Sequence, residues 1–145
     1  MKMRNSLVLP AVLHLLVSSA AFAAEPPKSN EQLVRDYVSA FNKHELDTML
    51  SMVSEDIQWL SVVGDKITVE TQGKAKLGES MTAYFRATPS VQSDLQWVQM
   101  TASRVAAMER ARWQGKSGPK SQSSLSVYEF HAGLITRVYY YPAEK

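Results

Sequence analysis

Apolar residues return every three or four positions in two stretches after residue 28, the spacing that one buried face of an α-helix requires. In the first stretch this face consists of Leu33, Val34, Tyr37, Val38 and Phe41. Ser29 and Gln32 precede it at capping-box spacing, so we expect a helix that begins at residue 29 or 30. The second stretch predicts a shorter helix, and the two helices form a pair. Its apolar residues are Leu46, Met49, Leu50 and Val53.

From Ile57 the period changes to two, which is the period of a β-strand. A turn at Gly64-Asp65 leads into a second alternating segment that ends at Gly73. A third helix follows, and Pro89 marks its end. Its apolar stripe consists of Leu77, Met81, Tyr84 and Phe85. Further extended segments are predicted at residues 95–102, 105–114, 125–131 and 134–141.

The links between these strands are too short for the crossover that joins two consecutive parallel strands. We therefore expect an α+β fold in which an antiparallel sheet of about six strands is wrapped on three helices. Neither an internal repeat nor a second domain is visible, so residues 24–145 are predicted to form one domain.

The first 23 residues have the order of a secretory signal peptide. Lys2 and Arg4 form a positively charged start, residues 7–17 form an apolar run, and Ala21-Phe22-Ala23 offers small residues for cleavage. An uncleaved membrane anchor is the alternative, but the run is shorter than the about 20 residues that span a bilayer. We expect an exported protein, periplasmic or secreted, with no stable membrane insertion after cleavage.

Loss of the signal peptide would also remove the excess of positive charge. The chain has 16 Lys and Arg against 14 Asp and Glu, and removing Lys2 and Arg4 makes the two counts equal. A neutral surface does not attract phosphate backbones over a distance, so we expect no nucleic acid partner.

The residue inventory excludes several kinds of chemistry. The sequence has no cysteine, which excludes disulfides and thiolate sites. After cleavage only His44 and His131 remain, too few for a three-histidine metal site, and both are expected to face water. The motifs of serine hydrolases, P-loop proteins and zinc peptidases are absent. We therefore expect no metal and no cofactor.

One run has a more specific pattern. The segment VRDYVSAFNKHELDTMLSMVSEDIQW, residues 34–59, resembles the opening of the nuclear transport factor 2-like superfamily, which includes the SnoaL-like polyketide cyclases and the ketosteroid isomerases. The matching residues are Tyr37, Ala40, Asn42, Leu46, Asp47, Leu50 and Asp56. The resemblance implies that residues 24–145 are a SnoaL-like domain whose curved sheet and three helices enclose a cone with a pocket.

The chemistry of the isomerases transfers only in part. In those enzymes a tyrosine on the first helix and a protonated aspartate on a late strand donate to the enolate, while an aspartate on the first strand moves the proton. The resemblance places the tyrosine at Tyr37, the base at Ser61 and the second donor at Ser126. A serine hydroxyl does not act as a carboxylate base near neutral pH, so isomerisation of the ketosteroid type is disfavoured.

Glu109 is the best candidate for another base. It shares a predicted strand face with Ala107, Ala111 and Trp113, so a carboxylate stands in an apolar row where burial suits it to proton transfer. The alternative is a salt bridge on an exposed face. The possible partners for that bridge are Arg110, Arg112 and Arg137.

Aromatic and hydroxyl side chains from several elements are expected to converge, as in pockets for small apolar ligands, although core packing explains part of this pattern. We assign no catalytic residue. The candidate pocket residues are Tyr37, Phe41, Trp59, Ser61, Tyr84, Phe85, Glu109, Ser126 and Tyr128. Strand side chains alternate, so at least one of the tyrosines at 139–141 faces outward. Together with Trp97 and Trp113, these tyrosines predict a homodimer through the outer sheet face.

Two functions remain open. The first is binding of a small hydrophobic molecule in the pocket without the acid pair of the isomerases. The second is a SnoaL-like enzyme of the isomerase, cyclase or dehydratase type that uses Tyr37 and an unassigned base such as Glu109. The direction of the Glu109 side chain, into the pocket or into water, distinguishes them. A third possibility is that the sheet surface is functional and the cavity is vestigial, as in adaptor members of the superfamily.

Overall fold

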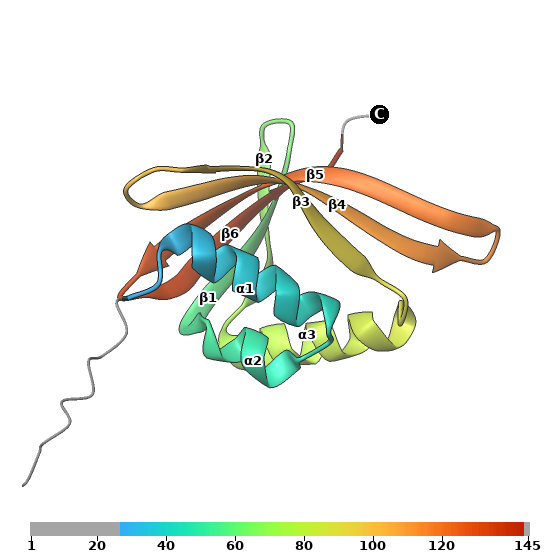
Figure 1. The fold of residues 1–145 in the computed structure, drawn as a ribbon, viewed down its shortest axis with the longest axis horizontal. Coiled ribbons are helices and arrows are strands. Elements are labelled where there is room, and N and C mark those ends of the chain that lie inside the picture. Colours follow the sequence, from blue (N-terminus) through green and yellow to red (C-terminus); the bar gives the residue numbers. More distant parts are fainter. Residues whose placement is uncertain (1–26, 144–145) are drawn as a thin grey trace, which may run out of the picture.

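The computed structural model describes residues 27–143, so the predicted signal peptide, residues 1–23, lies outside the described residues. Three helices cover one face of a six-stranded sheet (Figure 1). The elements are α1 (Asn30–Asn42), α2 (Leu46–Ser51), β1 (Val53–Val63), β2 (Lys66–Gln72), α3 (Lys74–Ala87), β3 (Gln92–Met100), β4 (Arg104–Gly115), β5 (Gly118–His131) and β6 (Leu134–Tyr141). The predicted α+β class and the three helices are confirmed.

The sheet is mixed rather than wholly antiparallel. Its strand order is β2-β1-β6-β5-β4-β3, and β1 pairs with β6 in the parallel direction, with Trp59 opposite Val138. All other neighbouring strands are antiparallel. The expectation of a simple antiparallel arrangement was wrong at this pair because the short links constrain only consecutive strands. Between β1 and β6 lie α3 and four strands, which provide ample chain for a crossover.

Helix α1 begins where the sequence predicts. The Ser29 hydroxyl accepts a hydrogen bond from the Gln32 backbone N–H at 3.1 Å, which caps the first turn. The apolar stripe of the helix faces the sheet, and Val34 and Tyr37 are buried there. The cap and the stripe together hold α1 across the concave side of the sheet.

Three strands begin earlier than the apolar pattern predicts. Strand β1 starts at Val53, which was wrongly predicted to belong to the second helix. In the other two, the added segment bears on the site. Strand β3 starts at Gln92, and β5 starts at Gly118, where it already pairs with Gly115 of β4. The added segments of β3 and β5 are polar and contain several serines, so they lack the alternation of apolar residues that marks a strand. This difference matters for the site, because Ser93 and Ser124 lie in the added segments.

The core lies between the sheet and the helices. It contains buried side chains from all three helices and from β1, β4, β5 and β6. Its largest members include Tyr128, Met49, Ile57, Leu77 and Ile135. Within the described residues, no helix is long and apolar enough to cross a membrane.

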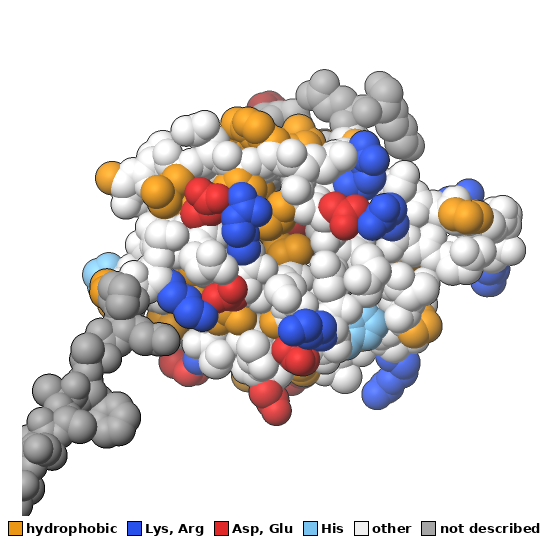
Figure 2. Space-filling model, viewed as in Figure 1, with side chains coloured by type: hydrophobic (Ala, Val, Ile, Leu, Met, Phe, Trp, Pro, Cys, Tyr) orange, Lys and Arg blue, Asp and Glu red, His pale blue; other side chains and the backbone are white. Residues whose placement is uncertain are grey.

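The convex face of the sheet has an apolar row. Trp97, Met108, Leu125 and Tyr141 lie opposite one another across β3, β4, β5 and β6. Trp97 is 49% exposed. Trp113 instead shares the concave side with Glu109 and packs against the core, so its predicted place on the outer face was wrong. Figure 2 shows another side of the surface, on which basic and acidic side chains lie beside each other rather than in separate patches.

Candidate functional site

A cavity of about 240 Å³ lies between the concave face of the sheet and the helices. The sheet contributes most of the polar groups of the cavity. The lining residues from the sheet are Trp59, Ser93, Glu109, Ala111, Ser124, Ser126, Tyr128 and Tyr140. The helices contribute a mostly apolar wall, from Tyr37, Val38, Phe41, Met49, Met81 and Tyr84. The cavity is therefore two-sided, with hydroxyls and one carboxylate facing rings and thioethers.

Glu109 faces into this cavity. The Tyr128 hydroxyl donates to its Oε1 at 2.6 Å, and the Ser93 hydroxyl donates to its Oε2 at 3.2 Å. These donors come from the strands on either side of β4, so the sheet itself fixes the position of the carboxylate. Hydrogen bonds to a carboxylate are shorter and stronger than those between neutral groups, as the bond from Tyr128 illustrates.

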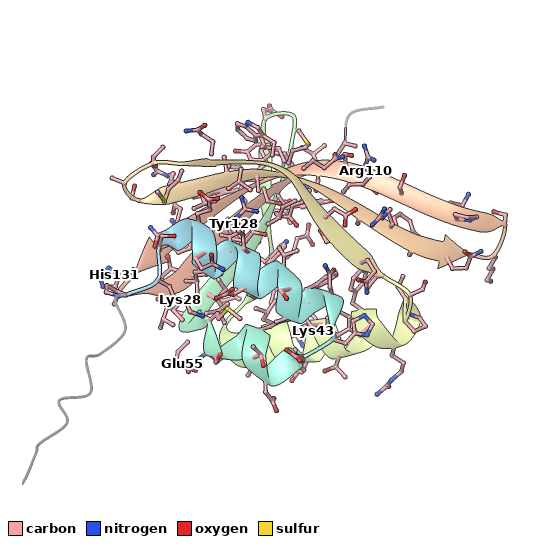
Figure 3. The ribbon with its side chains drawn as sticks, in the orientation of Figure 1. Lys28, Lys43, Glu55, Arg110, Tyr128 and His131 are labelled. Atoms are coloured by element: carbon pink, nitrogen blue, oxygen red, sulfur yellow. The ribbon has the colours of Figure 1, made fainter. Side chains whose placement is uncertain are left out.

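The alternative of a surface salt bridge for Glu109 was wrong. Arg112 pairs with Asp94 at 2.7 Å, and Arg137 pairs with Glu129. Arg110 follows Glu109 directly and therefore points to the opposite face of the sheet, away from the helices, whereas Tyr128 lies on the helix side (Figure 3).

Tyr37 places an unpaired hydroxyl at the cavity. Its side chain is 3% exposed, and its Oη finds no hydrogen-bond partner among the described residues. Burial, reinforced by the negative charge of Glu109, raises the pKa of Tyr37 above its ordinary value. The pKa of Tyr128 is raised in the same direction by burial and then by Glu109. Both phenols therefore keep their protons at neutral pH.

Three buried serines complete the polar wall. Ser93, Ser124 and Ser126 all line the cavity from β3 and β5. Ser126 occupies the position that the resemblance gives to the second acid of the isomerases, and its short hydroxyl lies in the strand between Ser124 and Tyr128. The wall thus offers hydroxyls at a place where the isomerases have a carboxyl group.

Seven of the nine residues proposed from the sequence line the cavity. They are Tyr37, Phe41, Trp59, Tyr84, Glu109, Ser126 and Tyr128. Ser61 and Phe85 are not among the lining residues. Ser61 lies two residues beyond Trp59, where β1 leaves the core, and the chain from Val63 to Glu70 is exposed. Phe85 is turned toward Phe41 and His44, with ring centroids 5.2 Å and 4.2 Å away.

The remaining lining residues were missed by the sequence analysis. They are Val38, Met49, Met81, Ser93, Ala111, Ser124 and Tyr140. Val38, Met49 and Met81 were predicted as apolar helix positions, but the pattern does not distinguish a cavity wall from a filled core. The spacing of two between Ser124, Ser126 and Tyr128 was a usable signal, because it places three hydroxyls on one strand face.

His44 and His131, the two histidines of the described residues, do not line the cavity. His131 is exposed, as expected. The expectation that His44 faces water was wrong, because its ring stacks on Phe85 and its Nε2 is buried without a partner among the described residues. Within the described residues, no cluster of three His, Cys, Asp or Glu side chains is placed to hold a metal ion.

Comparison with known proteins agrees with this architecture. The family model of the SnoaL-like domain matches residues 34–138. No curated protein matches the chain. Among solved structures, an uncharacterized cystatin-fold protein from Novosphingobium aromaticivorans superposes with a TM-score of 0.68 at 21% identity, covering 78% of this chain and 97% of that one.

Two further structures share the fold. An NTF2-like protein of unknown function from Cytophaga hutchinsonii has a TM-score of 0.65 at 13% identity, covering 83% of this chain and 95% of that one. A candidate polyketide cyclase from Xanthomonas campestris has a TM-score of 0.58 at 21% identity, covering 78% and 89%. The fold is thus that of the NTF2-like superfamily, and the chain belongs to the SnoaL-like domain family.

Proposed function

We propose that this domain binds a small, largely apolar molecule in the cavity, without the acid pair of the ketosteroid isomerases. The observation that carries the proposal is the Tyr37 hydroxyl, which is buried at the cavity wall without a partner among the described residues. A hydroxyl without a protein partner at a cavity wall is free to pair with a bound group, and a neutral hydrogen bond of this kind contributes about 0.5–1.5 kcal/mol net.

The walls favour a ligand with one polar side. Phe41, Met81 and Tyr84 give apolar contact from the helices, while the hydroxyls of the sheet lie opposite. At about 240 Å³ the cavity is slightly smaller than the about 300–1,000 Å³ of typical ligand pockets, so a small molecule such as a single ring with a short side chain fits. Such mostly apolar walls with a few polar groups are typical of small-molecule sites.

A direct test uses the neutral probe 2-phenylethanol in calorimetric titration of the mature chain. We expect saturable binding at millimolar concentration. Ala111→Leu adds bulk to the cavity wall and should abolish binding, whereas Ala83→Leu, an exposed position on α3, should leave it unchanged. Absence of saturable binding, or equal binding by the two leucine variants, would contradict a cavity site.

A second candidate function is supported by the direction of Glu109. Its carboxylate lines the cavity, as a general base for a bound molecule must, and a Tyr37 hydroxyl lies on the same cavity. This geometry supports an enzyme of the isomerase, cyclase or dehydratase type, and one structure of the same fold is described as a candidate cyclase.

Hydrogen exchange separates binding from catalysis. Small molecules that co-purify with the protein from its own host would be identified by mass spectrometry and incubated with fresh protein in D₂O. Proton abstraction by Glu109 predicts deuterium at a carbon position with the wild type and none with Glu109→Gln. Retention of the ligand without any deuterium uptake would leave binding as the function and exclude this base.

A further inference from the structure

The charge on the cavity wall is negative only. Glu109 is the only charged side chain among the described residues that line the cavity, and none of them is Lys, Arg or His. In the described part of the chain, residues 27–143, the ion pairs join Lys and Arg side chains to other acids. None of these ion pairs includes Glu109. Its neighbours are neutral hydroxyls. Glu109 is half-buried, and a carboxylate that is partly removed from water without a counter-ion favours a partner of positive charge.

Aromatic rings surround the same space. Those that line the cavity are Tyr37, Phe41, Trp59, Tyr84, Tyr128 and Tyr140. The face of an aromatic ring carries a negative partial charge that attracts cations, and the attraction strengthens where water is excluded. The rings and the carboxylate therefore both favour a positively charged ligand.

The hydrogen-bonding groups agree with this polarity. The hydroxyl hydrogens of Tyr128 and Ser93 are used in bonds to Glu109, so these two groups have no hydrogen left to donate to a ligand. The Glu109 carboxylate has about four acceptor positions and uses two of them. Tyr37 has an oxygen that accepts no bond from any described residue. The wall thus has free acceptors for a ligand rich in N–H donors.

Resting on the function proposed above, we propose that the molecule bound in this cavity is an organic cation, a small aromatic or aliphatic amine. Its ammonium group lies against the Glu109 carboxylate and the Tyr37 hydroxyl, and its carbon body packs against the rings of Phe41, Tyr84 and Trp59. The same wall rejects anions, because a carboxylate ligand would face Glu109 without any cation to neutralise it.

Three probes of nearly equal size test the charge directly: 2-phenylethylammonium, 2-phenylethanol and phenylacetate, each titrated calorimetrically at neutral pH and low salt. We expect the ammonium to bind about tenfold or more tighter than the alcohol, which corresponds to about 1.4 kcal/mol, and phenylacetate not to bind. If none of the three binds, the proposed cavity function itself fails. If the alcohol or the acid binds as tightly as the ammonium, the cavity is a binding site but the preference for cations is refuted.

Two glutamate variants locate the preference. Glu109→Gln keeps the shape of the side chain and should lower the ammonium affinity about tenfold while leaving the alcohol affinity within about threefold. Glu70→Gln makes the same change of net charge on the exposed β2 and should leave both affinities unchanged. Equal effects of the two variants would refute a role of Glu109. The three-probe series on the wild type decides the proposal even if Glu109→Gln does not fold.

Discussion

Tyr37→Phe and Tyr128→Phe are the same chemical change made at two buried positions that differ in one respect. The side chains are 3% and 1% exposed, and both belong to the hydrophobic core. The Tyr128 hydroxyl donates to Glu109 at 2.6 Å, whereas the Tyr37 hydroxyl has no partner among the described residues. The pair of variants therefore isolates the contribution of a buried hydrogen bond from that of the ring.

The two variants should change the free energy of unfolding in opposite directions. A hydrogen bond to a charged group contributes about 1.5–3 kcal/mol net, so Tyr128→Phe should lower the free energy of unfolding by about 2 kcal/mol. Tyr37→Phe breaks no bond and removes an unpaired hydroxyl. The cavity is large enough to hold water, which recovers most of the cost of burying that group, so the variant should be stabilised by about 0–1 kcal/mol.

Urea unfolding followed by tryptophan fluorescence at neutral pH measures both changes. The slope of the free energy against urea should match the wild type in each variant, which confirms that the same surface is exposed on unfolding. A loss at Tyr37→Phe as large as the loss at Tyr128→Phe would refute the reasoning, because it would mean that the Tyr37 hydroxyl has a structural partner.

The remaining predictions concern pH, assembly and export. The raised pKa values of Tyr37 and Tyr128 mean that the folded chain holds these protons more tightly than the unfolded chain. The contribution of these groups to the free energy of unfolding is therefore complete below about pH 10 and falls above it by about 1.4 kcal/mol per pH unit for each group. Urea unfolding at about pH 9 and about pH 11 would measure the fall, and an unchanged free energy of unfolding would contradict it. We propose that the convex face forms a homodimer, so light scattering should give a dimer mass for the wild type and a monomer mass for Trp97→Glu; a monomeric wild type would reject it. A fusion carrying the first 24 residues should be cleaved near Ala23 and leave the cytoplasm, and an uncleaved, membrane-bound fusion would exclude the signal peptide.

The alternation of side chains predicted the position of Glu109 well. Residues two apart on a strand share a face, and Ala107 is fully buried while Glu109 and Ala111 line the cavity. Serine-rich segments gave no comparable signal. Ser93 and Ser124 face the cavity because their backbones pair with β4, and backbone pairing leaves little trace in a polar sequence.

The pairing of strands far apart in the chain could not be predicted from the sequence. Periodicity predicted β1 and β6 separately, but their parallel contact depends on which strands meet after the chain has crossed the sheet. The placement of Ser61 was wrong for a related reason, since alternation gives the face of a residue but not the point at which a strand leaves the core. Turn and cap signals, such as Gly64-Asp65 and Ser29, are local, and these were confirmed.

The pairing of Val53 with Ile135 joins an early strand to the last strand in the middle of the sheet. Ribosomes add about 5–20 residues per second, so β1 is synthesised several seconds before its central partner exists. Strands β3, β4 and β5 can form hairpins in that interval. The core cannot close until β6 is made, and pairing β6 with β1 then costs the conformational entropy of closing the long stretch of chain between them. This delay leaves β1 without its parallel neighbour until the last strand of the sheet is made.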